Sequence, residues 1–181
     1  MEETGLLITY ETDKEKEETL DFIMIQYGKD ILQLAYTYVK DLSQAEDLAQ
    51  EIFIKCFRHL DSFKQQANVK TWLYRIASNH CKDYLKSWHH RKVTVNDKIT
   101  ELLLFSNHQV DEEVIKKDED EELVEAVFQL KIKYREVIYL YYYEDFSIKE
   151  ISQALKVNEN TVKTRLKRAR QLLKEILYQE D

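Results

Sequence analysis

The chain has 181 residues, of which 44% are hydrophobic, and this is enough for one domain of ordinary size or two small ones. It contains no proline and only two glycines, so the residues that usually end strands and build tight hairpins are nearly absent. The composition therefore predicts an all-α protein. No apolar run is long enough to span a membrane and the first residues are acidic, which predicts a cytosolic protein without a secretory signal.

The formal net charge of −7 is unevenly divided along the chain. Residues 62–92 carry seven bases against one acid, and residues 145–177 carry eight bases against four acids. The acids are concentrated in residues 1–30 and 93–122. Two basic segments in an acidic chain are expected of a protein that binds a polyanion, although runs of charge also occur on ordinary solvated helix faces.

Three helices are predicted in the first half of the chain. Apolar residues recur at spacings of three and four over residues 20–38, which is the stripe of a core-facing helix. A second helix is expected to begin with a capping box of Ser43 and Glu46 and to bury a stripe over residues 45–60. A polar loop then leads to a third periodic run at 69–88, and the three helices would form one small bundle.

A domain boundary is predicted where this periodicity fades and acids accumulate. The expected organisation is an acidic tail at 1–18, a helical domain at 19–92, a flexible linker at 93–118 and a second helical domain at 119–178. Two amphipathic helices are expected to follow the linker. Their predicted inward residues are Leu123, Val127 and Leu130 in one, and Val137, Ile138, Tyr141 and Tyr142 in the next.

The last thirty residues have the pattern of a helix-turn-helix. Ser147 and Glu150 form a capping box before a short apolar helix, residues 156–158 provide a three-residue turn, and Asn158 can cap a final helix. The predicted inward residues of that helix are Val162, Leu166, Ala169, Leu172, Leu173 and Ile176.

The outer face of this final helix is basic. In a helix-turn-helix the early residues of the second helix enter a DNA major groove, where Lys and Arg reach guanine and Thr reaches a base edge or methyl group. The candidates to read bases or clamp the backbone are Lys163, Thr164, Lys167 and Arg168. Phosphate contacts, which set affinity without reading sequence, are expected from Lys149, Arg165 and Arg170.

With both halves in place, the chain resembles a sigma-70 family transcription initiation factor of the short extracytoplasmic-function type. The resemblance covers residues 19–178 and rests on DLSQAEDLAQEIFIKCFRHLDSF, VKTWLYRIASNHCKDYLK and KYREVIYLYYYEDFSIKEISQALKVNENTVKTRLKRAR. The chain departs from the usual pattern at Leu130-Lys131, where leucine-proline is common, and at Lys156, where many such turns have glycine. A lysine with positive φ costs about 1 kcal/mol relative to glycine, which a domain can absorb.

The resemblance implies that the second predicted helix docks on the clamp helices of the largest RNA polymerase subunit. The residues off its buried stripe are available for that contact, namely Asp47, Gln50, Glu51 and Ile54. Taken alone, acidic residues on a helix face would indicate only solubility.

The resemblance also implies that the first domain opens the minus-ten region of promoters, which requires pockets for extruded bases and a basic track for the strand. The loop with Gln65, Gln66, Asn68 and Val69 would hold a flipped base, and Asn79 and Asp83 would line its approach. Tyr74 lies on the basic face with Lys70 and Arg75 and is the stacking candidate, whereas Trp72 and Tyr84 lie on the apolar stripe and are expected in the core. Phosphates would be tracked by Lys82, Lys86, Arg91 and Lys92.

Further partners follow from the resemblance. The last helix would read the minus-thirty-five element of promoter DNA while its domain contacts the flap of the second-largest polymerase subunit. An anti-sigma factor, in the membrane or outside it, is an expected partner. No small-molecule substrate, cofactor or metal is expected.

Two other classes of protein fit the sequence less well. Catalysis is disfavoured because H-E-x-x-H and the di-iron E-x-x-H motif are absent and two distant glycines cannot build a phosphate loop. Cys56 and Cys81 are too few for a disulfide framework or a zinc knuckle and are expected in the core. An ordinary helix-turn-helix regulator would share the final residues but leaves the TWLYRIASN and DLAQE segments unexplained.

Overall fold

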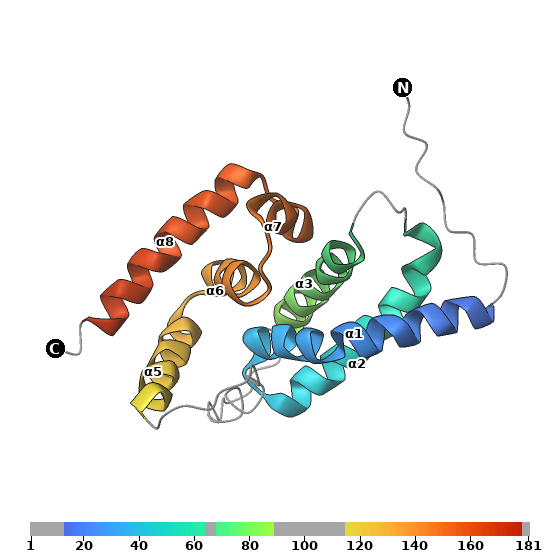
Figure 1. Cartoon of the computed structure of the whole chain (residues 1–181), viewed down its shortest axis with the longest axis horizontal. Coiled ribbons are helices and arrows are strands. Elements are labelled where there is room, and N and C mark those ends of the chain that lie inside the picture. Colours follow the sequence, from blue (N-terminus) through green and yellow to red (C-terminus); the bar gives the residue numbers. More distant parts are fainter. Residues whose placement is uncertain (1–12, 64–67, 89–114, 179–181) are drawn as a thin grey trace. The chain divides into compact units, whose positions relative to one another are not determined.

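The computed structural model describes residues 13–63, 68–88 and 115–178 (Figure 1). These residues are almost entirely helical and none of them lies in a β-strand, so the predicted all-α class is confirmed. The described residues belong to two compact units, each of which is treated by itself below. The first unit contains α1 to α3, and the second contains α5 to α8.

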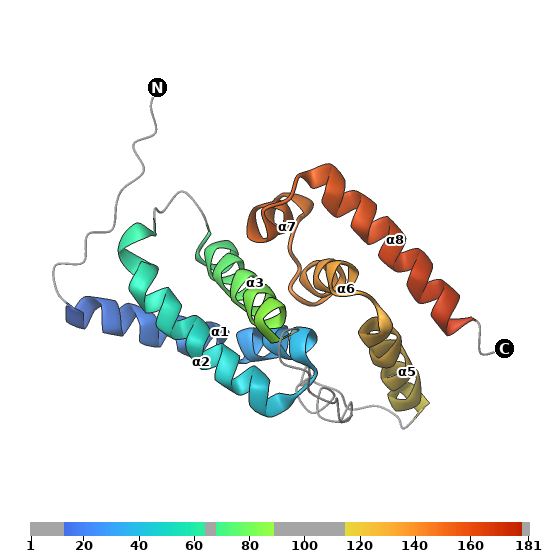
Figure 2. The ribbon, with the colours of Figure 1, turned by 180° about the vertical axis from the view of Figure 1, so that it is seen from behind.

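The first unit is a bundle of three helices, α1 (Asp13–Val39), α2 (Leu42–His59) and α3 (Val69–Trp88), with a short 3-10 turn η1 (Leu60–Ser62) after α2. Each of the three helices packs against the other two (Figure 2). The core contains side chains from all three, including Ile31, Leu34, Leu48, Ile52, Cys56, Leu73, Ala77 and Cys81. The bundle expected from the apolar spacing is therefore present.

Two helix starts in this unit differ from the prediction. Helix α1 begins at Asp13, so residues 13–18 are helical rather than part of a tail. Helix α2 is capped by Asp41, whose Oδ1 accepts a hydrogen bond from the Gln44 amide at 2.9 Å. The predicted cap Ser43 lies inside the first turn and is exposed. Asp and Ser are about equally good N-caps, so the residue types alone could not decide between them.

The second unit consists of α5 (Ile115–Gln129), α6 (Ile132–Ile138), a π-helical turn η2 (Tyr139–Tyr143), α7 (Ile148–Leu155) and α8 (Glu159–Leu177). Helix α8 packs against α5 and α6. The core of this unit is built from Val124, Phe128, Leu130, Val137, Leu140, Phe146, Ile151, Ala154, Val162, Leu166 and Ala169. A buried guanidinium joins two of these helices, because Arg135 Nη2 donates to the carbonyls of Phe128 and Leu130 at 3.0 and 2.9 Å.

The buried faces of α5 and of the tyrosine segment differ from the predicted stripes. Leu123 is exposed while its neighbour Val124 is buried, because six apolar residues crowd into eight positions and periodicity cannot choose between faces. Tyr142 is also exposed. The π-turn places one extra residue in this segment, as the Glu144 amide donating to the Tyr139 carbonyl shows, and this rotates the following side chains off the 3.6-residue pattern.

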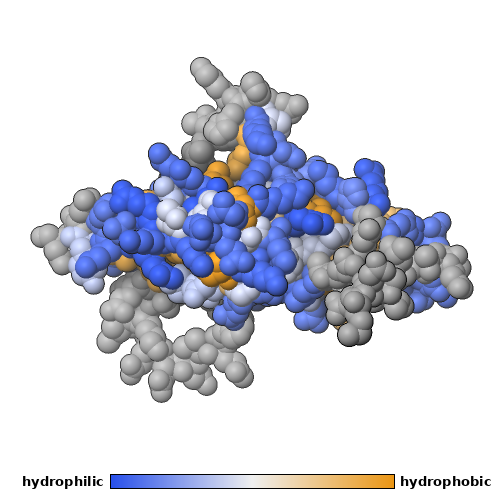
Figure 3. All heavy atoms as spheres, turned by 90° about the horizontal axis from the view of Figure 1, so that it is seen from above, coloured by the Kyte–Doolittle hydropathy of each residue, from blue (hydrophilic) through white to orange (hydrophobic). Residues whose placement is uncertain are grey.

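The visible surface is mainly hydrophilic, with apolar atoms confined to small areas (Figure 3). Both cysteines are buried and free, as expected from the sequence, and burial raises the pKa of each thiol to about 12. Among the described residues, no helix is both long enough and apolar enough to cross a membrane.

Candidate nucleic-acid interfaces

The turn between α7 and α8 is held by local hydrogen bonds. Ser147 and Glu150 form the predicted capping box, and Asn158 caps α8 by accepting from the Thr161 amide at 2.7 Å. Lys156 ends α7 with φ 53° and ψ 46°, the left-handed conformation expected from its place in the turn. The Ser152 hydroxyl donates to the Val157 carbonyl and closes the turn. This segment is therefore a helix-turn-helix.

The predicted base readers lie on the exposed side of α8, opposite buried Val162, Leu166 and Ala169. In the part of the chain that the structure describes, the ammonium groups of Lys163 and Lys167 form no hydrogen bond or ion pair. The other two predicted readers, Thr164 and Arg168, are engaged: the Thr164 hydroxyl donates to the Asn160 carbonyl at 2.8 Å, and Arg168 Nη1 lies 3.5 Å from both Gln171 Oε1 and Glu175 Oε1.

The three predicted phosphate contacts differ from one another. Lys149 is exposed on α7. Arg165 is only partly exposed, and its Nη1 donates to Glu136 Oε1 at 3.0 Å, which joins α8 to α6. Arg170 is exposed on α8 and donates from Nε to the Tyr142 hydroxyl at 2.8 Å, with its guanidinium within 6 Å of two tyrosine ring centroids. Two of the three guanidinium or ammonium groups are thus already bound within the fold.

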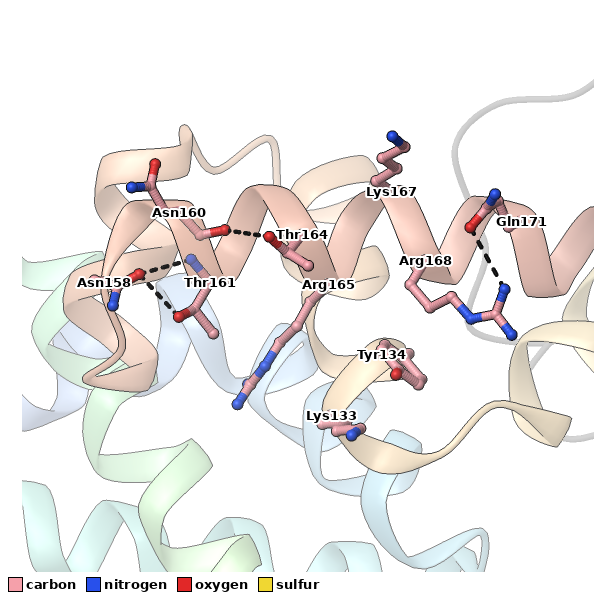
Figure 4. Close-up of a pocket in the computed structure, with 10 residues that line it drawn as sticks. All are labelled: Lys133, Tyr134, Asn158, Asn160, Thr161, Thr164, Arg165, Lys167, Arg168 and Gln171. Carbon is pink, nitrogen blue, oxygen red and sulfur yellow. Dashed lines mark hydrogen bonds between the residues drawn. The ribbon is translucent and has the colours of Figure 1, made fainter.

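A groove runs between α8 and the start of α6. Its lining includes the α8 cap Asn158 and four predicted site residues of α8, namely Thr164, Arg165, Lys167 and Arg168. Lys133 and Tyr134, for which the sequence predicted no role, also line it (Figure 4). In Figure 4, Arg165 and Arg168 point to the side on which Lys133 and Tyr134 lie, whereas Lys167 points away from α6. The only sequence signal for these two residues was their position in the KYREV segment.

In the first unit, the predicted minus-ten residues are gathered mainly on α3. Tyr74 is fully buried, with the Lys70 ammonium 5.7 Å from its ring centroid, so the expectation that it presents a stacking surface to solvent is wrong for this structure. A helix that packs against two neighbours retains only a narrow solvent face. That face retains exposed or half-buried Lys70, Arg75, Asn79, Lys82, Asp83 and Lys86.

The aromatic residues expected in the core are largely covered. Trp72 is buried, and its ring centroid lies 5.0 Å from that of Phe63. Tyr84 is half-buried and donates from its hydroxyl to Gln44 Oε1 at 2.9 Å, which ties α3 to α2.

The predicted base pocket before α3 is described only in part. Asn68 is exposed and its Oδ1 accepts from the Lys70 amide at 2.9 Å, so this side chain stabilises the start of α3. Val69 is half-buried. Gln65, Gln66, Arg91 and Lys92 lie outside the described residues.

The predicted polymerase-docking residues all lie on the outer side of α2. Asp47, Gln50 and Ile54 are exposed, and Ile54 retains 52% of its accessible surface. Glu51 differs, because its Oε2 lies 2.7 Å from His80 Nε2. The other ring nitrogen of His80 lies 2.6 Å from the Lys55 ammonium, so the buried imidazole bridges two α2 side chains to α3. No sequence pattern indicates this cluster, because its residues are distant in the chain.

Two helical units, of which the second carries a helix-turn-helix with a basic outer face, are typical of a DNA-binding protein. Comparison with known proteins agrees. Residues 23–91 match the family model of sigma-70 region 2, and residues 120–173 match that of sigma-70 region 4. The chain belongs to the sigma-70 family, in its extracytoplasmic-function (ECF) group, and is a promoter-directing initiation factor of RNA polymerase.

Several curated relatives cover nearly the whole chain. ECF RNA polymerase sigma factor SigM of Bacillus subtilis is 35% identical over 162 residues, which is 86% of this chain and 93% of the relative. SigW of the same organism is 32% identical, with 83% and 84% covered. The ECF sigma-E factor of Escherichia coli is 28% identical, with 94% and 92% covered.

Two solved structures share the fold. CnrH, in complex with the cytosolic domain of CnrY, aligns with a TM-score of 0.67 at 19% identity and covers 93% of this chain and 96% of its own. RpoE of Bartonella quintana, in complex with the anti-sigma factor NepR, aligns with a TM-score of 0.66 at 21% identity and covers 91% and 97%.

Proposed function

We propose that the exposed face of α8 reads the minus-thirty-five element, with Lys163, Thr164, Lys167 and Arg168 toward the bases. The observation that carries this assignment is that Lys163 and Lys167 stand exposed on the second helix of the helix-turn-helix without a partner among the described residues. An ammonium group that is not engaged within the fold is available to the O6 and N7 acceptors of guanine.

The test uses the holoenzyme, reconstituted from core polymerase and the full chain. Promoter duplexes are first selected by the wild-type holoenzyme from a library with randomised elements, and affinity is then measured for variants of the minus-thirty-five sequence. Lys167→Ala should cost about 1 to 3 kcal/mol at some sequences and little at others. Equal losses at every sequence would mean that Lys167 contacts a phosphate. Lys174→Ala, in the last turn of α8, is the control and should leave the affinity unchanged at every minus-thirty-five sequence.

We further propose that the solvent face of α3 opens the minus-ten region. The support is a row of polar and basic side chains on one helix face, in which Asn79 and Asp83 lie one turn apart. Asn79→Ala should lower permanganate reactivity of thymines near the start site at equal promoter occupancy. Unchanged reactivity would remove Asn79 from the opening step.

The outer side of α2 is the proposed docking surface for the polymerase clamp. Its support is the exposure of Asp47, Gln50 and Ile54 on one helix face. Asp47→Lys should weaken holoenzyme formation at least tenfold in a titration with core polymerase. Replacing Glu51 would be a poorer test, because Glu51 also bonds His80 and its loss would act on the fold. Asp21→Lys, an equal charge reversal on an exposed residue of α1, is the control.

An anti-sigma factor is the proposed inhibitory partner. The support is that RpoE was determined in complex with the anti-sigma factor NepR, and CnrH in complex with the cytosolic domain of CnrY. Because the protein acts on polymerase and promoter DNA, the proposed location is the cytoplasm. Reading and opening DNA require only noncovalent contacts, so no catalytic step or small-molecule substrate is proposed. Run-off transcription tests the whole assignment. Core polymerase should start at the selected promoter only when the protein is added, and a duplex-binding regulator would fail to confer initiation.

A further inference from the structure

The groove between α8 and the start of α6 has a positive lining. Ten residues line it, four of them are basic (Lys133, Arg165, Lys167 and Arg168) and none is acidic. Arg165 is engaged by Glu136, and Arg168 lies near Gln171 and Glu175. Lys133 is exposed, and its ammonium lies 5.0 Å from the ring centroid of Tyr134 beside it. The wall of the groove opposite α8 thus offers one ammonium and one phenol hydroxyl.

The dimensions of DNA determine what reaches this groove. The major groove is about 12 Å wide and an α-helix with its side chains is about 10 to 12 Å across, so a helix that enters the major groove has a sugar-phosphate strand along each flank. One flank of α8 carries Thr161, Arg165 and Arg168, and this is the flank that faces the start of α6. A strand on that side passes between the two helices.

We propose that this groove holds one phosphodiester strand of the DNA that α8 reads, with Lys133 and Tyr134 as its outer wall. The inference rests on the proposed reading of DNA by α8. The Lys133 ammonium donates to a phosphate oxygen, and the Tyr134 hydroxyl supplies a second, neutral donor. These contacts set affinity and the angle of α8 in the major groove and carry no base preference of their own.

The experiment measures affinity of the holoenzyme for the selected promoter duplex over a range of salt concentrations. Lys133→Ala should weaken binding roughly three- to tenfold at every minus-thirty-five sequence, and the slope of log affinity against log salt should become shallower by about 1. Lys133→Arg should retain both values. Lys131→Ala removes an exposed lysine two residues earlier, outside the groove lining, and should leave affinity and slope unchanged.

The outcomes separate this inference from the function on which it rests. Suppose that Lys133→Ala leaves affinity and salt slope unchanged while Lys167→Ala shows its expected loss of affinity. This result would contradict the proposal that a DNA strand lies in the groove, but it would still support the reading of DNA by α8. Weaker holoenzyme formation in Lys133→Ala with an unchanged salt slope would also overturn it, since the groove would then bind a polymerase segment. If neither Lys133→Ala nor Lys167→Ala changes the affinity for the promoter, the proposed role of α8 itself is refuted.

Discussion

The Arg165 guanidinium donates from Nη1 to Glu136 Oε1 at 3.0 Å, and the Glu136 side chain is only 2% exposed. This contact joins α8 to α6 across 29 positions of sequence. A carboxylate so deeply buried is costly without a partner, so the pair constrains the fold of the second unit in addition to any contact of Arg165 with DNA.

Removal of the guanidinium should therefore destabilise the second unit. Arg165→Ala should lower its free energy of unfolding by about 2 to 4 kcal/mol, because the buried Glu136 carboxylate loses the guanidinium that pairs with it at 3.0 Å. Urea unfolding followed by far-ultraviolet circular dichroism measures the loss. Both tryptophans, Trp72 and Trp88, belong to the first unit, so the fluorescence transition should not move. A loss below 0.5 kcal/mol, the range expected for the exposed Lys163→Ala, would contradict the structural role.

The cap of α2 can be tested by two single substitutions. Asp41→Ala should lower the stability of the first unit by about 1 kcal/mol, because the Gln44 amide loses its acceptor, whereas Ser43→Ala should change it by less than about 0.5 kcal/mol. Tryptophan fluorescence in urea reports this unit. The opposite ranking of the two variants would restore Ser43 as the cap.

The turn of the helix-turn-helix contains a backbone strain that glycine would relieve. Lys156→Gly should raise the stability of the second unit by up to about 1 kcal/mol, since Lys156 has φ 53° and glycine adopts this region without a steric penalty. The matched variant is Lys174→Gly within α8, which should cost about 1 kcal/mol. Destabilisation by both substitutions would show that the Lys156 side chain contributes more than its conformation costs.

The two buried thiols should make the first unit sensitive to alkaline pH. Burial raises each pKa from 9.0 to about 12, so above pH 9 the unfolded chain releases thiol protons that the folded chain retains. The unfolded state therefore binds fewer protons, and stability is lost as the pH rises from 9 toward 12, by at most about 1.4 kcal/mol per pH unit for each thiol.

Urea unfolding at a series of alkaline pH values measures this dependence. Cys56→Ala should reduce the slope by about half. Alkylation provides an independent measurement, because the native protein should react slowly with iodoacetamide at pH 8 and the unfolded chain should react at both cysteines. Rapid alkylation of the native protein would contradict burial of the thiols.

Local features of the helix-turn-helix were predictable from the residues. The capping box of Ser147 and Glu150, the Asn158 cap and the left-handed Lys156 all depend on hydrogen bonds or torsions within about four positions of the chain. The all-α class followed from the lack of proline and glycine. Interactions of such short range are determined mainly by the order of side chains and depend little on what the rest of the protein does.

The state of the individual site residues was decided by the tertiary structure. Arg165 and Arg170 look alike in sequence, yet one is tied to a buried glutamate of α6 and the other to a tyrosine of the π-turn. Glu51 meets His80 only because α2 packs on α3. Tyr74 is buried although helical spacing put it on the basic face. Sequence alone determined the caps of α7 and α8 and the buried stripe of α8. The three-dimensional packing decided which polar groups remain available for DNA, because that depends on partners 25 or more positions away.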